Sequence, residues 1–135
     1  MGEFRAPFRK AIGVFAIVFG AASIFAGGGV LFGGETTRTL AGNVVPVVLW
    51  FNFLAGFGYI AAGVGIYAAR SWAPPLSAVI AAASVCVFAL FGFQVIAGAA
   101  YEMRTVWAMT FRCVIWIAIA FIACRACLQA HFARG

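Results

Sequence analysis

The sequence predicts an all-α membrane protein whose four transmembrane helices form an up-down-up-down antiparallel bundle. The first observation behind this fold class is composition. Of the 135 residues, 66% are hydrophobic and only 9% are charged, whereas about 25% of a typical soluble domain is charged. A soluble domain of this size has too little interior to hide so much apolar surface. The second observation is that charged residues fall mainly in short connections between long apolar runs. We therefore expect lipid to be the solvent for most of the chain.

One domain covering residues 1–135 is expected to contain all four spans. The predicted spans are approximately residues 11–32, 44–69, 75–100 and 105–126. The first apolar run, Ala11 to Gly34, is longer than the apolar region of a signal peptide, so we expect a retained helix. Pro46 and the Pro74-Pro75 pair suit the first turns of the second and third spans, where a missing N–H is harmless. Short connections make successive spans antiparallel neighbours.

Small residues recur at helical spacing and predict the faces through which the spans pack. In the first span this face holds Gly13, Ala16, Gly20, Ser23 and Gly27. In the second it holds Asn52, Gly56, Tyr59 and Gly63. In the third we expect it to hold Ala78, Ala82, Val85, Ala89 and Gly92. Small side chains let helix backbones approach closely in lipid, so each face is predicted to lie against another helix.

Lysine and arginine are distributed unequally between the two predicted ends of the bundle. If the N-terminus is inside, six lie inside and three outside: Arg5, Arg9, Lys10, Arg70, Arg125 and Arg134 against Arg38, Arg104 and Arg112. Because cytoplasmic segments carry the excess of positive residues, both termini are predicted to be cytoplasmic, in a bacterial inner (cytoplasmic) membrane. The net charge of +6 does not indicate nucleic acid, since the basic residues are isolated at the edges of apolar runs. The expected partner is the lipid bilayer.

The last apolar run is too short to cross a membrane without a charge. Only twelve uncharged residues separate Arg112 from Arg125. A helix of that length covers about 18 Å, against a hydrocarbon core of about 30 Å. At least one of the two guanidinium groups is therefore predicted to lie below the lipid headgroups.

Arg112 is expected to share its depth with two amides from neighbouring spans. Asn52 and Gln94 should each lie about 10 Å inside the outer boundary, counted along their helices. Together with Tyr101 and Glu102 these residues predict a ligand-binding pocket in the outer leaflet. Arg112 would be its cationic anchor, Glu102 the counter-charge, and the two amides its polar walls. The alternative is that Arg112 reaches the headgroups and the amides only join helices.

A second candidate site lies near the C-terminus. Cys124, Cys127 and His131 are spaced by three and four residues, so one face of a helix could present all three. Two thiolates and an imidazole suit zinc or copper, although a fourth ligand is missing. The Cys-x-x-Cys pair could instead exchange thiols. The simpler interpretation is that these cysteines pack as small apolar residues, and we expect no cofactor unless this face binds a metal.

The segments Val48 to Phe57, Tyr101 to Thr105 and Ala108 to Thr110 resemble those of small uncharacterised bacterial four-span membrane proteins. A looser likeness to DoxX-like four-helix membrane proteins rests on size and span count. The resemblance implies four spans but no particular activity.

No catalytic signature accompanies these patterns, so we expect a non-enzymatic protein. The leading hypothesis is an accessory subunit, or a small-molecule or lipid-binding protein that uses the outer polar cluster. The alternatives are a thiol- or metal-handling protein and a small oligomeric transporter. The small-residue faces could support a homo-oligomer or a larger membrane complex.

Overall fold

The computed structural model describes residues 6–42 and 45–134, which form helices and connections but no strand. The four long helices are α1 (Ala6–Phe32), α3 (Pro46–Tyr67), α4 (Ala73–Ile96) and α5 (Met103–Arg134). A short helix, α2 (Glu35–Ala41), joins α1 to α3. Each of the four long helices has the length and apolar composition needed to cross a membrane. The predicted all-α, four-helix architecture is confirmed.

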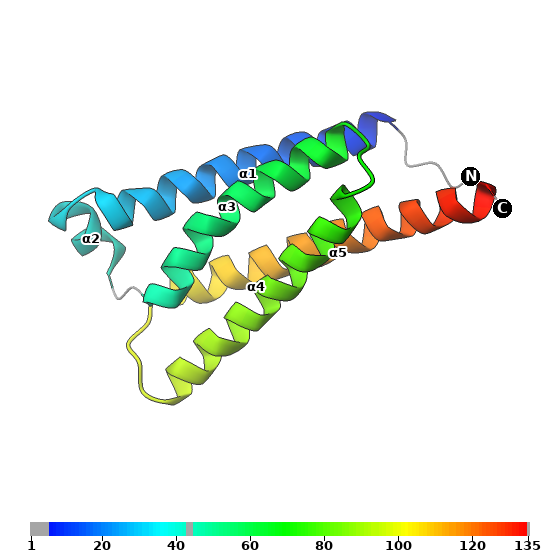
Figure 1. Ribbon diagram of the computed structural model, residues 1–135. Coiled ribbons are helices and arrows are strands. Elements are labelled where there is room, and N and C mark those ends of the chain that lie inside the picture. Colours follow the sequence, from blue (N-terminus) through cyan, green and yellow to red (C-terminus); the bar gives the residue numbers. More distant parts are fainter. Residues whose placement is uncertain (1–5, 43–44, 135) are drawn as a thin grey trace.

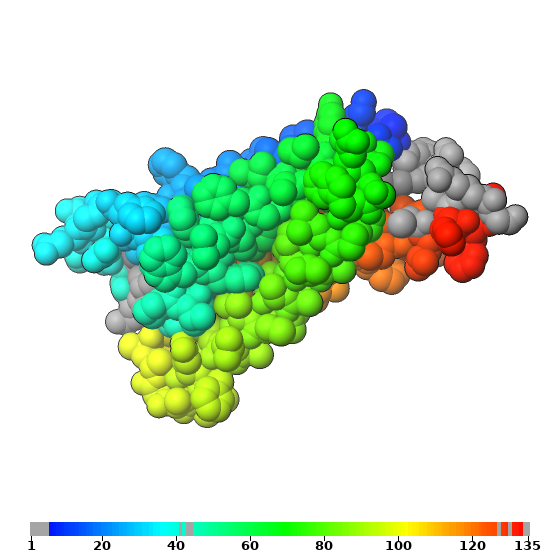
Figure 2. Space-filling model, viewed as in Figure 1, coloured from blue at the N-terminus to red at the C-terminus, as the bar shows by residue number. Residues whose placement is uncertain are grey.

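The long helices run alternately up and down (Figure 1). The beginning of α1, the α3–α4 connection and the end of α5 lie at one end of the bundle, and α2 and the α4–α5 connection lie at the other. With its 32 residues α5 is about 48 Å long, more than a hydrocarbon core of about 30 Å. Figure 2 shows α3 and α4 covering its first part, while its C-terminal part projects beyond them.

Local sequence explains where the helices begin and end. Prolines occupy the first turns of α3 and α4, where no N–H partner is needed. Glycines with positive φ, Gly34 and Gly42, flank α2 on either side. From α2, Arg38 donates from Nε to the Val30 carbonyl at 3.3 Å and from Nη2 to the Leu31 carbonyl at 3.1 Å. These two bonds satisfy carbonyls that the last turn of α1 leaves without helical partners.

Glycines bring the backbones of α1 and α3 into close contact. A Cβ added to Gly20 would lie 2.6 Å from the Gly56 carbonyl oxygen. Farther along, a Cβ added to Gly13 would lie 2.7 Å from the Gly63 carbonyl oxygen. The buried residues of α1 are Gly13, Ala16, Gly20, Ser23 and Gly27. The predicted packing face of the first span is therefore confirmed.

The predicted packing face of the third span is wrong. Ala78, Ala82, Val85 and Ala89 of α4 are exposed on the bundle surface. The buried residues of α4 are Ala73, Ser77, Ile80, Ala81, Ser84 and Phe91. Small residues occur on several faces of this helix, so their spacing does not select one. The face that turns inward carries both buried serines, since a hydroxyl is poorly solvated by lipid chains.

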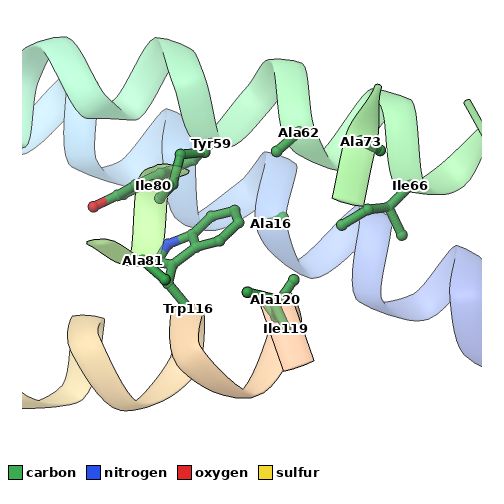
Figure 3. Packing of buried hydrophobic residues seen from close by; sticks show 10 residues of the cluster. All are labelled: Ala16, Tyr59, Ala62, Ile66, Ala73, Ile80, Ala81, Trp116, Ile119 and Ala120. Carbon is green, nitrogen blue, oxygen red and sulfur yellow. The ribbon is translucent and has the colours of Figure 1, made fainter. Parts of the chain in front are cut away.

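Large side chains fill the space between the tightly packed α1–α3 pair and the α4–α5 pair. The rings of Tyr59 and Trp116 stack with their centroids 4.8 Å apart at the centre of this layer. Both residues are fully buried. Figure 3 shows them between helices, and Ala16, Ala62, Ile119 and Ala120 continue the cluster to one side of the two rings. The layer determines how polar groups are held between the two helix pairs.

Candidate functional site

Arg112 lies inside the bundle, on α5, and only 8% of it is exposed. From Arg112, Nη1 donates to the Asn52 amide oxygen on α3, and Nη2 donates to the Ser23 hydroxyl on α1 at 3.5 Å. The guanidinium group thus joins three helices. The structure brings Arg112 and Asn52 together, in agreement with the prediction that the two residues lie at the same depth in the membrane.

Two aromatic rings complete the surroundings of the guanidinium group. Its central carbon lies 5.5 Å from the centroid of the Phe19 ring and 5.8 Å from that of the Tyr59 ring. An arginine at the membrane centre costs at least about 2.5–3.5 kcal/mol. Ring faces recover part of this cost, because the negative face of an aromatic ring attracts a cation. No carboxylate of residues 6–42 or 45–134 pairs with Arg112.

A pocket of about 240 Å³ opens next to the Asn52 side of this arrangement. It is lined by Val45, Val48, Leu49, Asn52, Glu102, Arg104, Thr105 and Ala108. These residues come from the beginnings of α3 and α5 and from the connections that precede them, all toward the α2 end of the bundle. Asn52 therefore connects the pocket with the buried Arg112.

Glu102 does not pair with Arg112 but lines the part of the pocket formed by the beginning of α5 and the connection before it, which we call the mouth of the pocket. Its carboxylate packs against Gly42, at the point where a Cβ of that residue would project. Beside it, Arg104 donates from Nη2 to the Leu40 carbonyl at 3.2 Å. One acidic and one basic side chain thus tie the beginning of α5 to the end of α2.

The remaining two residues of the predicted cluster lie elsewhere. Tyr101 is partly exposed and packs edge-on against Phe91, with ring centroids 6.1 Å apart. Gln94 is half-buried on α4, and within the described part of the chain its side chain forms no hydrogen bond. Neither residue lines the pocket beside Asn52.

Three buried polar groups near Arg112 were not assigned to a site from the sequence. They are the hydroxyls of Tyr59 and Ser84 and the indole N–H of Trp116, all on residues with 0% exposure. Within residues 6–42 and 45–134, none of these three groups has a hydrogen-bond partner, and neither does Nε of Arg112. Helical spacing could have connected one of them to the site from the sequence, since Trp116 is one turn beyond Arg112 on the same helix.

The predicted Cys124–Cys127–His131 face begins where α5 still packs against the first turn of α4 and continues toward the C-terminal end of α5. The Cys124 thiol is half-buried and points to the Pro74 carbonyl at 3.8 Å. His131 is exposed, with its ring against that of Phe132. The Cys127 side chain lies outside the described residues. Among the side chains that are described, no three His, Cys, Asp or Glu residues are grouped to hold a metal ion.

The four apolar helices and the charge held between them define a multi-pass α-helical membrane protein. Comparison with known proteins adds no closer relationship: no family model, no curated protein and no solved structure matches this chain.

Proposed function

We propose that this membrane protein is not an enzyme and that it binds a small amphiphilic molecule, of lipid type, in the pocket beside Asn52. The observation that supports this most directly is the composition of the pocket lining. Val45, Val48 and Leu49 supply an apolar wall, and Asn52, Glu102, Arg104 and Thr105 supply polar groups. A binding site commonly combines an apolar wall with a few placed polar groups.

The polar residues of the lining indicate which headgroup suits the pocket. Glu102 contributes a carboxylate and Arg104 a guanidinium group, both at the mouth. A zwitterionic headgroup would meet both charges, while its acyl chain follows the apolar wall into the bilayer. Behind the pocket, Arg112 holds the Asn52 amide in a fixed orientation. The buried cation thereby pre-organises one polar wall of the site.

The pocket is proposed to face the outer leaflet of a bacterial inner membrane, with both termini cytoplasmic. The support is the excess of Lys and Arg at the end opposite α2. Two single-cysteine variants in a cysteine-free background test it. A membrane-impermeant maleimide should label Thr37→Cys on α2 in intact cells, and His131→Cys only after permeabilisation. The reverse pattern would overturn the proposed orientation.

The binding proposal is tested by filling the pocket. Ala108 lines it, whereas Ala118 is exposed on the same helix, about three turns farther along. The variants Ala108→Phe and Ala118→Phe add the same ring to α5. Native mass spectrometry in mild detergent should find bound lipid on the wild type and on Ala118→Phe, and at least about tenfold less on Ala108→Phe.

Two results of that experiment would contradict the proposal. The first is equal lipid retention by the two phenylalanine variants, which would assign the bound lipid to the general apolar surface. The second is a wild-type protein that carries no small molecule but a stoichiometric protein partner. That result would favour the role of accessory subunit. The same spectra report whether the chain is a homo-oligomer.

A further inference from the structure

We infer that the bundle interior holds a second site, next to Arg112, that binds a small monovalent anion of about the size of chloride or bromide. This inference is independent of what occupies the pocket beside Asn52. It rests on a set of buried donors that lack acceptors and on the unbalanced charge at their centre. Both features belong to the layer of large side chains between the two helix pairs.

The four unpartnered polar groups lie in one region of that layer. Arg112 and Trp116 are one helical turn apart on α5. Tyr59 stacks on Trp116, and its ring lies beside the guanidinium group of Arg112. In Figure 3, the Tyr59 hydroxyl and the Trp116 indole nitrogen both point toward the beginning of α5, the direction in which Arg112 lies. From α4, the Ser84 hydroxyl lies close enough to the Tyr59 hydroxyl to interact with it, although the two groups do not have the geometry of a normal hydrogen bond.

The chemistry of these groups selects an acceptor. Indole N–H and guanidinium Nε can only donate hydrogen bonds, and the two hydroxyls can donate or accept. The Asn52 carbonyl, which is the neighbouring acceptor, is already used by Nη1 of Arg112. A water molecule there could accept from the two N–H groups and donate to the two hydroxyls, but it would leave the charge of Arg112 unbalanced. An anion can accept from all four groups and balances that charge as well.

The positive charge of Arg112 also favours an anion as the ligand. Arg112 carries a positive charge that no carboxylate of the described residues balances. Buried polar groups are normally satisfied, and a buried charge is normally paired. A monovalent anion would satisfy both requirements at once, with Arg112 as counter-ion and the Tyr59, Ser84 and Trp116 groups as neutral donors. The surrounding aromatic rings favour a small ion over a phosphate or a headgroup.

Trp116 supplies the readout, since a heavy halide quenches indole fluorescence on contact. The chain has four tryptophans, and the other three, Trp50, Trp72 and Trp107, are exposed. Replacing those three by Phe leaves Trp116 as the reporter. Bromide should quench it saturably when exchanged for gluconate at constant ionic strength in detergent, and chloride should reverse the quenching by competition.

Serine variants of α4 provide a matched pair. Ser84 and Ser77 are both fully buried, but the Ser77 hydroxyl donates to the Ala73 carbonyl of its own helix at 2.9 Å. We expect Ser84→Ala to raise the half-saturating bromide concentration several-fold and Ser77→Ala to leave it unchanged. Arg112→Gln should raise it at least about tenfold.

Three outcomes would overturn the anion site: quenching that rises linearly without saturation, no quenching at all, and equal effects of the two serine variants. If Arg112→Gln does not fold, the serine pair decides the question alone, because each of those variants removes a single oxygen.

Discussion

The amide oxygen of Asn52 on α3 accepts a hydrogen bond from Arg112 on α5, across 60 positions of sequence. This bond joins the tightly packed α1–α3 pair to the α4–α5 pair at the level of the pocket. It holds the charged end of Arg112 where no carboxylate of the described chain pairs with it. The contact therefore has two effects: it holds the guanidinium group inside the bundle, and it orients the Asn52 amide that lines the pocket.

Removing the Asn52 amide should destabilise the bundle. Asn52→Leu leaves Nη1 of Arg112 buried without its acceptor, and a buried unsatisfied donor costs about 1–3 kcal/mol. Reversible unfolding in mixed micelles, followed by circular dichroism, measures this loss. Gln94→Leu is the control, because this half-buried amide has no hydrogen bond in the described structure. We expect the control to change stability by no more than about 0.5 kcal/mol.

The double variant Asn52→Leu/Arg112→Leu should lose less stability than the two single variants together. With the charge removed, no unsatisfied cation remains, so the two changes are coupled. Additive losses, or equal losses for Asn52→Leu and Gln94→Leu, would contradict the role assigned to the Asn52–Arg112 bond.

The close contact of α1 and α3 should be intolerant of a single methyl group. Gly20→Ala places a Cβ 2.6 Å from the Gly56 carbonyl oxygen, and backbone cannot yield as a flexible side chain does. We expect a loss of about 1–3 kcal/mol in the free energy of unfolding. Gly92→Ala on α4 is the control, since a Cβ there meets nothing within 4 Å. That variant should be neutral or more stable by about 0.5–1 kcal/mol, because alanine favours the helix.

The sequence predicted the face of α1 that makes this contact, because Gly13, Ala16, Gly20, Ser23 and Gly27 recur at helical spacing over most of the helix. From the short uncharged run between Arg112 and Arg125, it also predicted that at least one guanidinium group lies below the lipid headgroups. Both inferences use arithmetic along one helix, namely spacing and length. Such quantities do not depend on how the helices pair, so the order of residues alone is enough to calculate them.

Contacts between different helices were harder to predict from the sequence. On α4, small residues are spread around the helix, and in lipid an apolar residue is about equally stable inside or outside the bundle. The inward face is identified instead by Ser77, Ser84 and Phe91, spaced at seven residues. Likewise, nothing local indicates that Tyr59 stacks on Trp116. The donor cluster around Arg112 follows from that stacking, so it depends on how α3 and α5 pack.

Arg38 should hold the last turn of α1 in place. Its side chain donates to the Val30 and Leu31 carbonyls, which lack helical partners at the end of the helix. Arg38→Ala should therefore accelerate hydrogen exchange of amides in the last turn of α1, several-fold, and lower stability by about 1 kcal/mol. Thr39→Ala is the control, because that hydroxyl bonds to the Glu35 carbonyl within α2. Unchanged exchange in Arg38→Ala would show that the turn is held by other contacts.

A pair of glycines with positive φ isolates the contribution of Glu102 to the mouth of the pocket. Gly42 (φ 76°) and Gly34 (φ 90°) flank α2, and alanine at either position meets similar backbone strain, about 1 kcal/mol or more. The two sites differ in their surroundings. A Cβ at Gly34 meets nothing within 4 Å, whereas a Cβ at Gly42 collides with the Glu102 carboxylate.

Gly42→Ala should therefore be the more destabilising change, and it alone should reduce lipid retention, since it displaces a charged group of the pocket lining. Unfolding in mixed micelles and native mass spectrometry on both variants measure the two effects. Equal stability losses with equal lipid retention would mean that the Glu102 carboxylate moves aside freely. In that case its position at the pocket mouth would have no part in binding.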